Sequence, residues 1–140
     1  MSTVHNKDLV RHAMNELDHR NLDGVIATYA PGAIFHGFAP VILDVSGYQQ
    51  MMAALLDAFP DSRFHVDDII TEGDKVAVRH HMEGIHQAPL QGIPASGQHV
   101  RVDAISIFRI KDEQIAETWL SADFLGLMQQ VGAVPMSAQS

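Results

Sequence analysis

Two carboxylates late in the chain, Asp103 and Glu117, are the side chains best placed for acid/base chemistry. Both lie in stretches of alternating polar and apolar residues, which are typical of half-buried strands. A carboxylate in an apolar cavity, or beside a second carboxylate, has a raised pKa and can remove a proton next to a carbonyl group. The pattern therefore predicts a proton-transfer pair. The alternative is that each carboxylate is solvated or pairs with Arg101 or Arg109.

The register of the last hairpin decides which side chains accompany this pair. With a three-residue loop at 111–113, Ile110 pairs with Gln114 and the two carboxylates share one strand face. A two-residue loop at 111–112 would place them on different faces. Besides the carboxylates, the face predicted from the longer loop carries Ile105, Ile107, Trp119, Ser121 and Asp123.

Histidines offer a second set of polar groups. His36 lies within a short predicted strand, where it either orients a substrate oxygen or is a core histidine bonded to the backbone. A two-residue turn at 73–74 puts Asp68 opposite Arg79, with His81 and Glu83 on the same face. An ion pair between Asp68 and Arg79 is the simpler explanation of that second cluster.

Neither a metal nor an organic cofactor is expected. The chain has nine histidines but no H-x-x-x-H or H-E-x-x-H spacing, and the neighbours His80 and His81 point to opposite faces of a strand. The absence of cysteine excludes thiolate catalysis and Cys-ligated zinc. The three lysines, Lys7, Lys75 and Lys111, lie at a terminus or at turns, which argues against Schiff-base chemistry.

Three helical segments precede most of the predicted strands. Apolar residues recur at helical spacing within residues 4–19 and again within residues 22–29. A capping box of Ser46 and Gln49 predicts the start of a third helix, which Pro60 ends.

The remaining chain alternates with period two and is predicted to be mainly sheet. The loop 87–98, with two prolines and two glycines, is long enough to form a rim or lid. A short helix near residues 124–131 precedes a tail, residues 134–140, that is expected to fray. The predicted strands are 33–38, 63–71, 75–86, 99–110 and 114–123.

These elements predict one α+β domain spanning residues 1–140, a length typical of a single core. Three N-terminal helices would cover one face of a curved antiparallel sheet and leave an internal cavity for a ligand.

Charge and hydropathy limit the classes of partner. Lysine and arginine total 9 against 17 acidic residues, for a net charge of −8, and the basic residues are scattered. Nucleic acid is therefore not expected as a partner. No apolar run approaches the roughly 18 residues of a membrane span, and the first residues lack the apolar core of a signal peptide. We expect a cytoplasmic protein that does not bind membranes.

Five stretches carry a resemblance to a known family: AFPD (58–61), EGDKVAVR (72–79), GIPASG (92–97), ISIFRIKD (105–112) and ETWLSADFLGLMQQVGA (117–133). They resemble the SnoaL-like polyketide cyclase family, within the nuclear-transport-factor-2-like superfamily. The resemblance implies a cone-shaped fold that binds a small, largely apolar molecule and often dimerises through its open sheet face. The family's characterised cyclases close a ring by intramolecular aldol condensation without a metal or organic cofactor.

Two features depart from the family pattern. Glu113 stands at a turn position where the family usually has glycine, and His80-His81 replaces an aromatic and a small polar residue. The first affects turn geometry, and the second affects what the pocket recognises.

The resemblance implies roles for individual residues in a cyclase of the polyketide or ester type. Glu117 with Asp103 would move the proton, His36 would assist at an oxygen of a small apolar carbonyl compound, and Trp119 would stack on it. Isomerisation, dehydration, epoxide opening and a non-catalytic dimeric binding module are the alternatives. Further substrate-binding residues are expected to be Phe35, Met51, Phe59, His81, Ile105 and Asp123.

Overall fold

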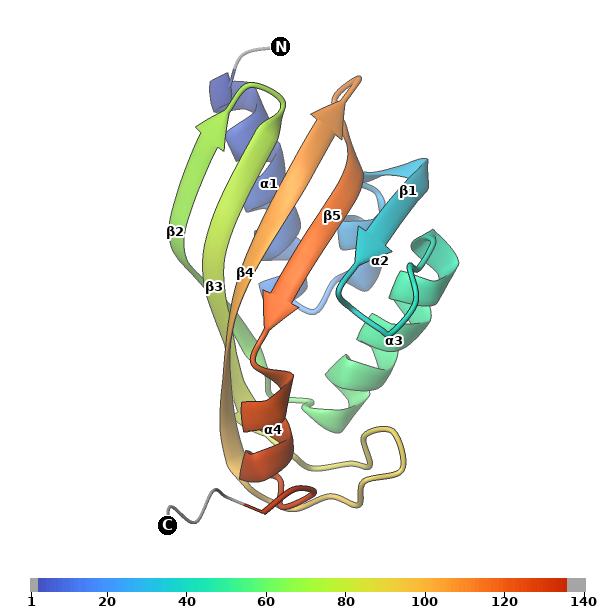
Figure 1. Cartoon of the computed structure of the whole chain (residues 1–140), viewed down its shortest axis with the longest axis vertical. Coiled ribbons are helices and arrows are strands. Elements are labelled where there is room, and N and C mark those ends of the chain that lie inside the picture. Colours follow the sequence, from blue (N-terminus) through green and yellow to red (C-terminus); the bar gives the residue numbers. More distant parts are fainter. Residues whose placement is uncertain (1–2, 136–140) are drawn as a thin grey trace.

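The computed structural model describes residues 3–135, so residues 136–140 of the predicted tail lie outside the described part. The described chain is a mixed α+β fold, as predicted (Figure 1). In chain order its elements are α1 (Thr3–Asp18), α2 (Leu22–Ile26), β1 (Tyr29–His36), α3 (Val45–Ala58), β2 (Arg63–Glu72), β3 (Lys75–Ile85), β4 (His99–Lys111), β5 (Gln114–Ala122) and α4 (Phe124–Gln130).

The five strands form one sheet in the order β1-β5-β4-β3-β2. β1 pairs with β5 in parallel, and the other neighbours are antiparallel. Along β4, buried and exposed residues alternate, with the even-numbered positions from Val100 to Ile110 buried. This alternation means that helices cover one sheet face, the inner face, and that the outer face is left open.

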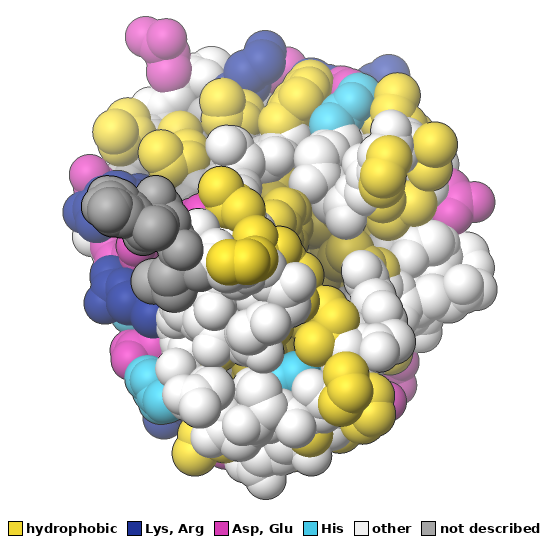
Figure 2. Space-filling model, turned by 60° about the horizontal axis from the view of Figure 1, so that its bottom comes forward, with side chains coloured by type: hydrophobic (Ala, Val, Ile, Leu, Met, Phe, Trp, Pro, Cys, Tyr) yellow, Lys and Arg dark blue, Asp and Glu magenta, His cyan; other side chains and the backbone are white. Residues whose placement is uncertain are grey.

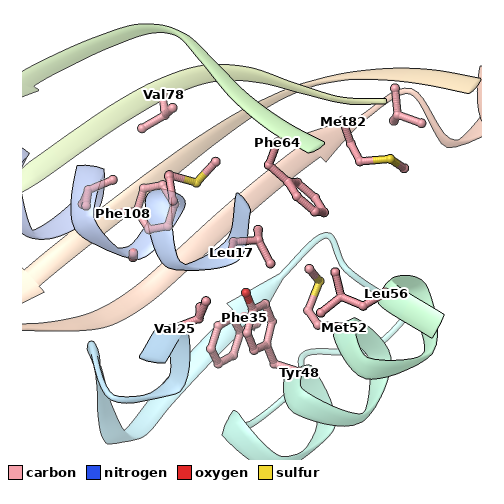
Figure 3. Close-up of a cluster of buried hydrophobic side chains, with 14 of the residues drawn as sticks. Leu17, Val25, Phe35, Tyr48, Met52, Leu56, Phe64, Val78, Met82 and Phe108 are labelled. Carbon is pink, nitrogen blue, oxygen red and sulfur yellow. The ribbon is translucent and has the colours of Figure 1, made fainter. Parts of the chain in front are cut away.

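The helices pack on the inner face and form the core with it. α1 lies over β2 and β3, and α3 lies beside β1 (Figure 1). Figure 3 shows Met52 of α3 pointing toward Phe64 and Met82 of the sheet, with Leu17 of α1 between these layers.

Two helix boundaries differ from the prediction. α2 ends at Ile26, and the strand β1 already begins at Tyr29. The N-cap of α3 is Asp44, whose carboxylate accepts a hydrogen bond of 2.8 Å from the Gly47 amide. The predicted capping box at Ser46 is wrong because Asp44 caps the amide three residues on and starts the helix two residues earlier.

The first hairpin follows the predicted register only near its turn. Glu72 pairs with Lys75, and Asp68 pairs with Arg79, as predicted. Asp67 is an extra residue in β2, a β-bulge, so Val66 pairs with His80 rather than with His81. The bulge changes which residues of β2 lie opposite β3 beyond it.

The second hairpin has a two-residue turn, so the predicted three-residue loop is wrong. Lys111 pairs with Gln114, and the turn residues Asp112 and Glu113 have φ angles of 52° and 64°. Ile110 pairs with Ile115 in the same register, and a bulge at Ala116 then shifts it, so Arg109 pairs with Glu117. Because this extra residue restores the alternation, the strand face predicted to hold Asp103, Glu117 and Trp119 is formed.

None of the helices within residues 3–135 has the length and apolar character needed to cross a membrane.

Candidate functional site in the cavity between helices and sheet

A cavity lies between the inner sheet face and helices α1, α3 and α4. Its volume is about 110 Å³, several times the roughly 10–15 Å³ that one water molecule needs on the same measure. Figure 2 shows a hollow with hydrophobic side chains inside, at the end of the molecule where α4 lies. The site is therefore a mostly apolar pocket suited to a small organic ligand.

A short polar strip crosses the sheet side of this cavity. His80 of β3 and Ser106 of β4 both line it, and the His80 Nε2 atom lies 2.9 Å from the Ser106 Oγ atom. Burial lowers the pKa of His80 to about 4, so the imidazole is neutral at pH 7. Thr118 of β5 continues the strip, and its side chain is buried against the cavity.

Two tyrosines supply further hydroxyl groups to the cavity wall. Tyr48 stacks on Phe35 with ring centroids 4.2 Å apart, and Tyr29 packs against both rings. Figure 3 shows the Tyr48 hydroxyl directed from α3 toward the space below the sheet. Burial raises the pKa of Tyr29 to about 12 and raises that of Tyr48 well above its ordinary value. Both phenols are therefore neutral hydrogen-bond donors at pH 7.

The two predicted proton-transfer carboxylates do not line this cavity. They lie with Trp119 on the outer sheet face, and the described residues of the cavity wall include no aspartate or glutamate. The sequence correctly predicted which residues of β4 and β5 share a strand face. The helices, however, cover the other face of the sheet. The expectation of a carboxylate pair inside an apolar cavity is therefore wrong.

Glu117 is held by two neighbours on the outer face. Its Oε2 atom lies 2.7 Å from the Nε2 atom of His36, and its Oε1 atom accepts hydrogen bonds of 3.1 Å from the Arg109 guanidinium. The hydrogen bond with His36, followed by that with Arg109, lowers the pKa of Glu117. Both carboxylate oxygens of Glu117 are therefore occupied by His36 and Arg109, which leaves neither oxygen free to take a proton from a substrate.

Asp103 is likewise engaged by a cation. Its carboxylate lies 3.1 Å from the Arg101 guanidinium, and 70% of its side chain is exposed. His36 contacts Glu117, and its ring stacks on that of Trp119 with centroids 5.3 Å apart. The structure thus joins His36 to Glu117 and separates Asp103 into another ion pair.

The remaining predicted binding residues are divided among four places. Met51 lines the cavity, whereas Phe35 and Phe59 are buried in the core outside its lining. Ile105 and His81 lie on the outer face. Asp123 caps α4 through a hydrogen bond of 2.8 Å from the Gly126 amide.

The sequence interpretation missed His80 and Ser106 as cavity residues. The alternation of β4 contained a signal for Ser106. Ser106 lies on the same strand face as Val100, Val102 and Phe108, which are more apolar than the residues between them. Choosing the more apolar parity as the covered face would have placed Ser106 in the cavity.

Comparisons with known proteins agree with this architecture. The sequence profile of SnoaL-like polyketide cyclases matches residues 8–131. Among curated proteins, none matches the chain.

Solved structures with similar folds include AclR, a candidate hydroxylase from Streptomyces galilaeus, at 25% identity and a TM-score of 0.89, covering 96% of this chain and 100% of AclR. TsrD from Streptomyces laurentii is 27% identical with a TM-score of 0.84, covering 96% of this chain and 99% of TsrD. A candidate SnoaL-like polyketide cyclase from Jannaschia sp. CCS1 is 27% identical with a TM-score of 0.83, covering 95% of each chain.

Proposed function

Because the chain belongs to the SnoaL-like polyketide cyclase family, we propose that it binds a small, largely apolar carbonyl compound in the inner cavity and closes a ring in it by an aldol-type reaction. The observation that carries this proposal is the contact between His80 and Ser106 on a mostly apolar cavity wall. In this contact His80 is the proton acceptor and Ser106 holds its ring in place. Both lie in a site that can hold an organic molecule.

The proposed reaction needs no group beyond these side chains and the substrate. His80 takes a proton from the carbon next to one carbonyl, and the resulting enolate attacks a second carbonyl of the same molecule. A carbon–carbon bond forms, and His80 returns the proton to the new alkoxide oxygen. Ser106 orients the imidazole, and Tyr48 can donate a hydrogen bond to a substrate oxygen, since its hydroxyl is neutral and faces the cavity.

Exchange of the α-protons of 2-tetralone in deuterated water, followed by proton NMR, tests the first step with an apolar ketone. His80→Gln keeps hydrogen-bonding capacity but removes the base, so the catalysed exchange should fall by about 100-fold or more. His36→Gln and Glu117→Gln are matched controls on the outer face, and they should leave exchange unchanged.

The controls also test the competing assignment of the proton transfer to Glu117, Asp103 and His36. Retained exchange in His80→Gln together with loss in Glu117→Gln would establish that assignment and overturn ours. A protein that neither exchanges nor binds 2-tetralone would also contradict the proposal.

A second candidate function is binding without turnover, and it is favoured by the lack of a carboxylate among the described cavity-lining residues. This candidate predicts saturable binding of 2-tetralone with no exchange above the rate in buffer. The same experiment therefore distinguishes an enzyme from a binding module.

We further propose that two copies of the chain pair through their outer sheet faces. Ile34, Ile105 and Ile107 expose 37%, 54% and 38% of their surface there, next to Trp119. A second copy would cover these apolar side chains, which a monomer leaves in water.

A further inference from the structure

Beyond the cavity, the outer sheet face carries a cluster of histidines and carboxylates at the end of β2, β3 and β4. His65 of β2 pairs directly with His81 of β3, and Glu83 follows two residues later on the same strand face. The ligand atoms of these three residues all lie within 4.8 Å of one another. We propose that they form a binding site for a divalent transition metal of the zinc class.

The distances fit such a site. The Glu83 Oε2 atom lies 3.4 Å from the Nε2 atom of His81 and 3.8 Å from the Nε2 atom of His65. Metal–ligand bonds of about 2.0–2.2 Å place neighbouring ligand atoms of a tetrahedral zinc site about 3.3–3.6 Å apart. Small side-chain rotations therefore bring the three atoms to one ion.

Asp67 gives independent support, because it orients the central ligand. Its carboxylate lies 2.7 Å from the Nδ1 atom of His81, which leaves the Nε2 atom facing Glu83. A carboxylate on the far nitrogen of a metal-binding histidine fixes its ring and raises its basicity. Asp67, the extra residue at the bulge, thus holds the ring of His81, and only 10% of the His81 side chain is exposed.

A fourth ligand is within reach at the neighbouring strand. The Nε2 atom of His99 lies 3.7 Å from the Glu83 Oε1 atom, and 61% of the His99 side chain is exposed. Two or three imidazoles with one carboxylate favour Zn²⁺ over Mg²⁺ or Ca²⁺, which prefer oxygen ligands. A bound ion would also tie the edge strand β2 to β3.

The sequence predicted His81 and Glu83 on one strand face, but it did not predict a metal site there, since His65 comes from another strand and the bulge at Asp67 brings it opposite His81. No local spacing such as H-x-x-x-H marks it, and the adjacency of His80 and His81 argued only that one of them faces each side. The two histidines therefore have different surroundings. His80 lines the cavity, and His81 belongs to the candidate metal site on the outer face.

Isothermal titration of the full chain with ZnCl₂ at pH 7.5 tests the proposal. We expect one saturable Zn²⁺ per chain that Mg²⁺ does not displace. His65→Asn and Glu83→Gln change partly exposed side chains and should abolish this binding, and Asp67→Asn should weaken it by about 10- to 100-fold. His36→Asn, which disrupts the other histidine–glutamate pair on the outer face, is the matched control and should bind as the wild type does.

The visible absorption of Co²⁺ is a second readout, and it reports the ligands around the ion rather than whether the chain is folded. The wild type loaded with Co²⁺ should show the intense visible absorption of a four-coordinate ion, and His65→Asn should not. The absence of saturable Zn²⁺ binding, or binding that persists in both His65→Asn and Glu83→Gln, would overturn the proposal. The assignment does not depend on catalysis in the cavity, so either proposal can fail alone.

Discussion

At the scale of single residues, surroundings decide what a charged side chain can do. Glu117 and Asp103 have the right chemistry for proton transfer, yet each contacts an arginine on the outer face. His80 is half-buried and lines the cavity. The residue types were therefore informative, but their surroundings come from packing that a local pattern does not contain.

Asp18 makes a prediction about stability and pH. Its carboxylate accepts hydrogen bonds of 2.8 and 2.9 Å from Arg63 and one of 2.8 Å from the Phe64 amide. The hydrogen bond from Arg63 is the main reason that the pKa of Asp18 falls from 3.8 to about 2. A depressed carboxylate pKa stabilises the fold above the unfolded value, and this stabilisation is lost as the pH falls from about 4 toward 2.

Asp18→Asn should therefore lower the free energy of unfolding by about 1 kcal/mol at pH 6, a value reduced for the water that screens the exposed Arg63. At pH 2 the difference from the wild type should nearly vanish. Urea unfolding at both pH values measures it, with Asp57→Asn on the exposed face of α3 as the control. An equal difference at the two pH values would contradict this account.

At the scale of elements, the turn between β4 and β5 contains local strain. Asp112 and Glu113 both have positive φ angles, as a two-residue hairpin turn of type I′ requires. Aspartate tolerates this conformation, whereas glutamate does so less readily.

Glu113→Gly should raise the free energy of unfolding by about 0.5–1 kcal/mol, because glycine removes this strain. The contact between His5 and Glu113 that would be lost is 3.3 Å long and exposed, and it contributes little. Thermal unfolding measures the effect, with Asp112→Gly expected to stabilise less. A lower melting temperature for Glu113→Gly would show that the turn is not strained there.

Most elements could be predicted from the sequence, whereas the two β-bulges could not. Period-two patterns located β2 to β5 within two residues, because alternate burial is imposed by the sheet itself. The bulges at Asp67 and Ala116 leave no such signal, since an extra residue is stabilised by neighbours on other strands. The predicted cross-strand pairs beyond each bulge were therefore wrong.

At the scale of the whole molecule, the site depended on which sheet face the helices cover. The alternation along β4 and β5 groups Asp103 with Glu117 and Ser106 with Thr118, but grouping alone does not say which set is inside. That choice comes from α1 and α3, whose apolar sides need a matching sheet face. The predicted ligand cavity exists, and its polar residues come from the other face.

The open outer face leads to a prediction about assembly. If a second copy covers Ile105 and its neighbours, Ile105→Asp should convert a dimer into a monomer, because the charge would be buried at the contact. Light scattering coupled to gel filtration measures the mass. Ile42→Asp is the control, since Ile42 is 61% exposed in the loop before α3. A wild-type protein that is monomeric at high concentration would contradict the dimer.

The most direct test of the central claim is NMR of the chain with methyl-labelled methionine during titration with 2-tetralone. Of the seven methionines, Met14, Met51, Met52 and Met82 line the cavity, and Met128 packs at the core edge outside its lining. A ligand in the inner cavity should shift those four methyl signals in a saturable way and leave Met128 unchanged. If the four signals stay fixed while the indole signal of Trp119 moves, the ligand binds on the outer face and the account is wrong.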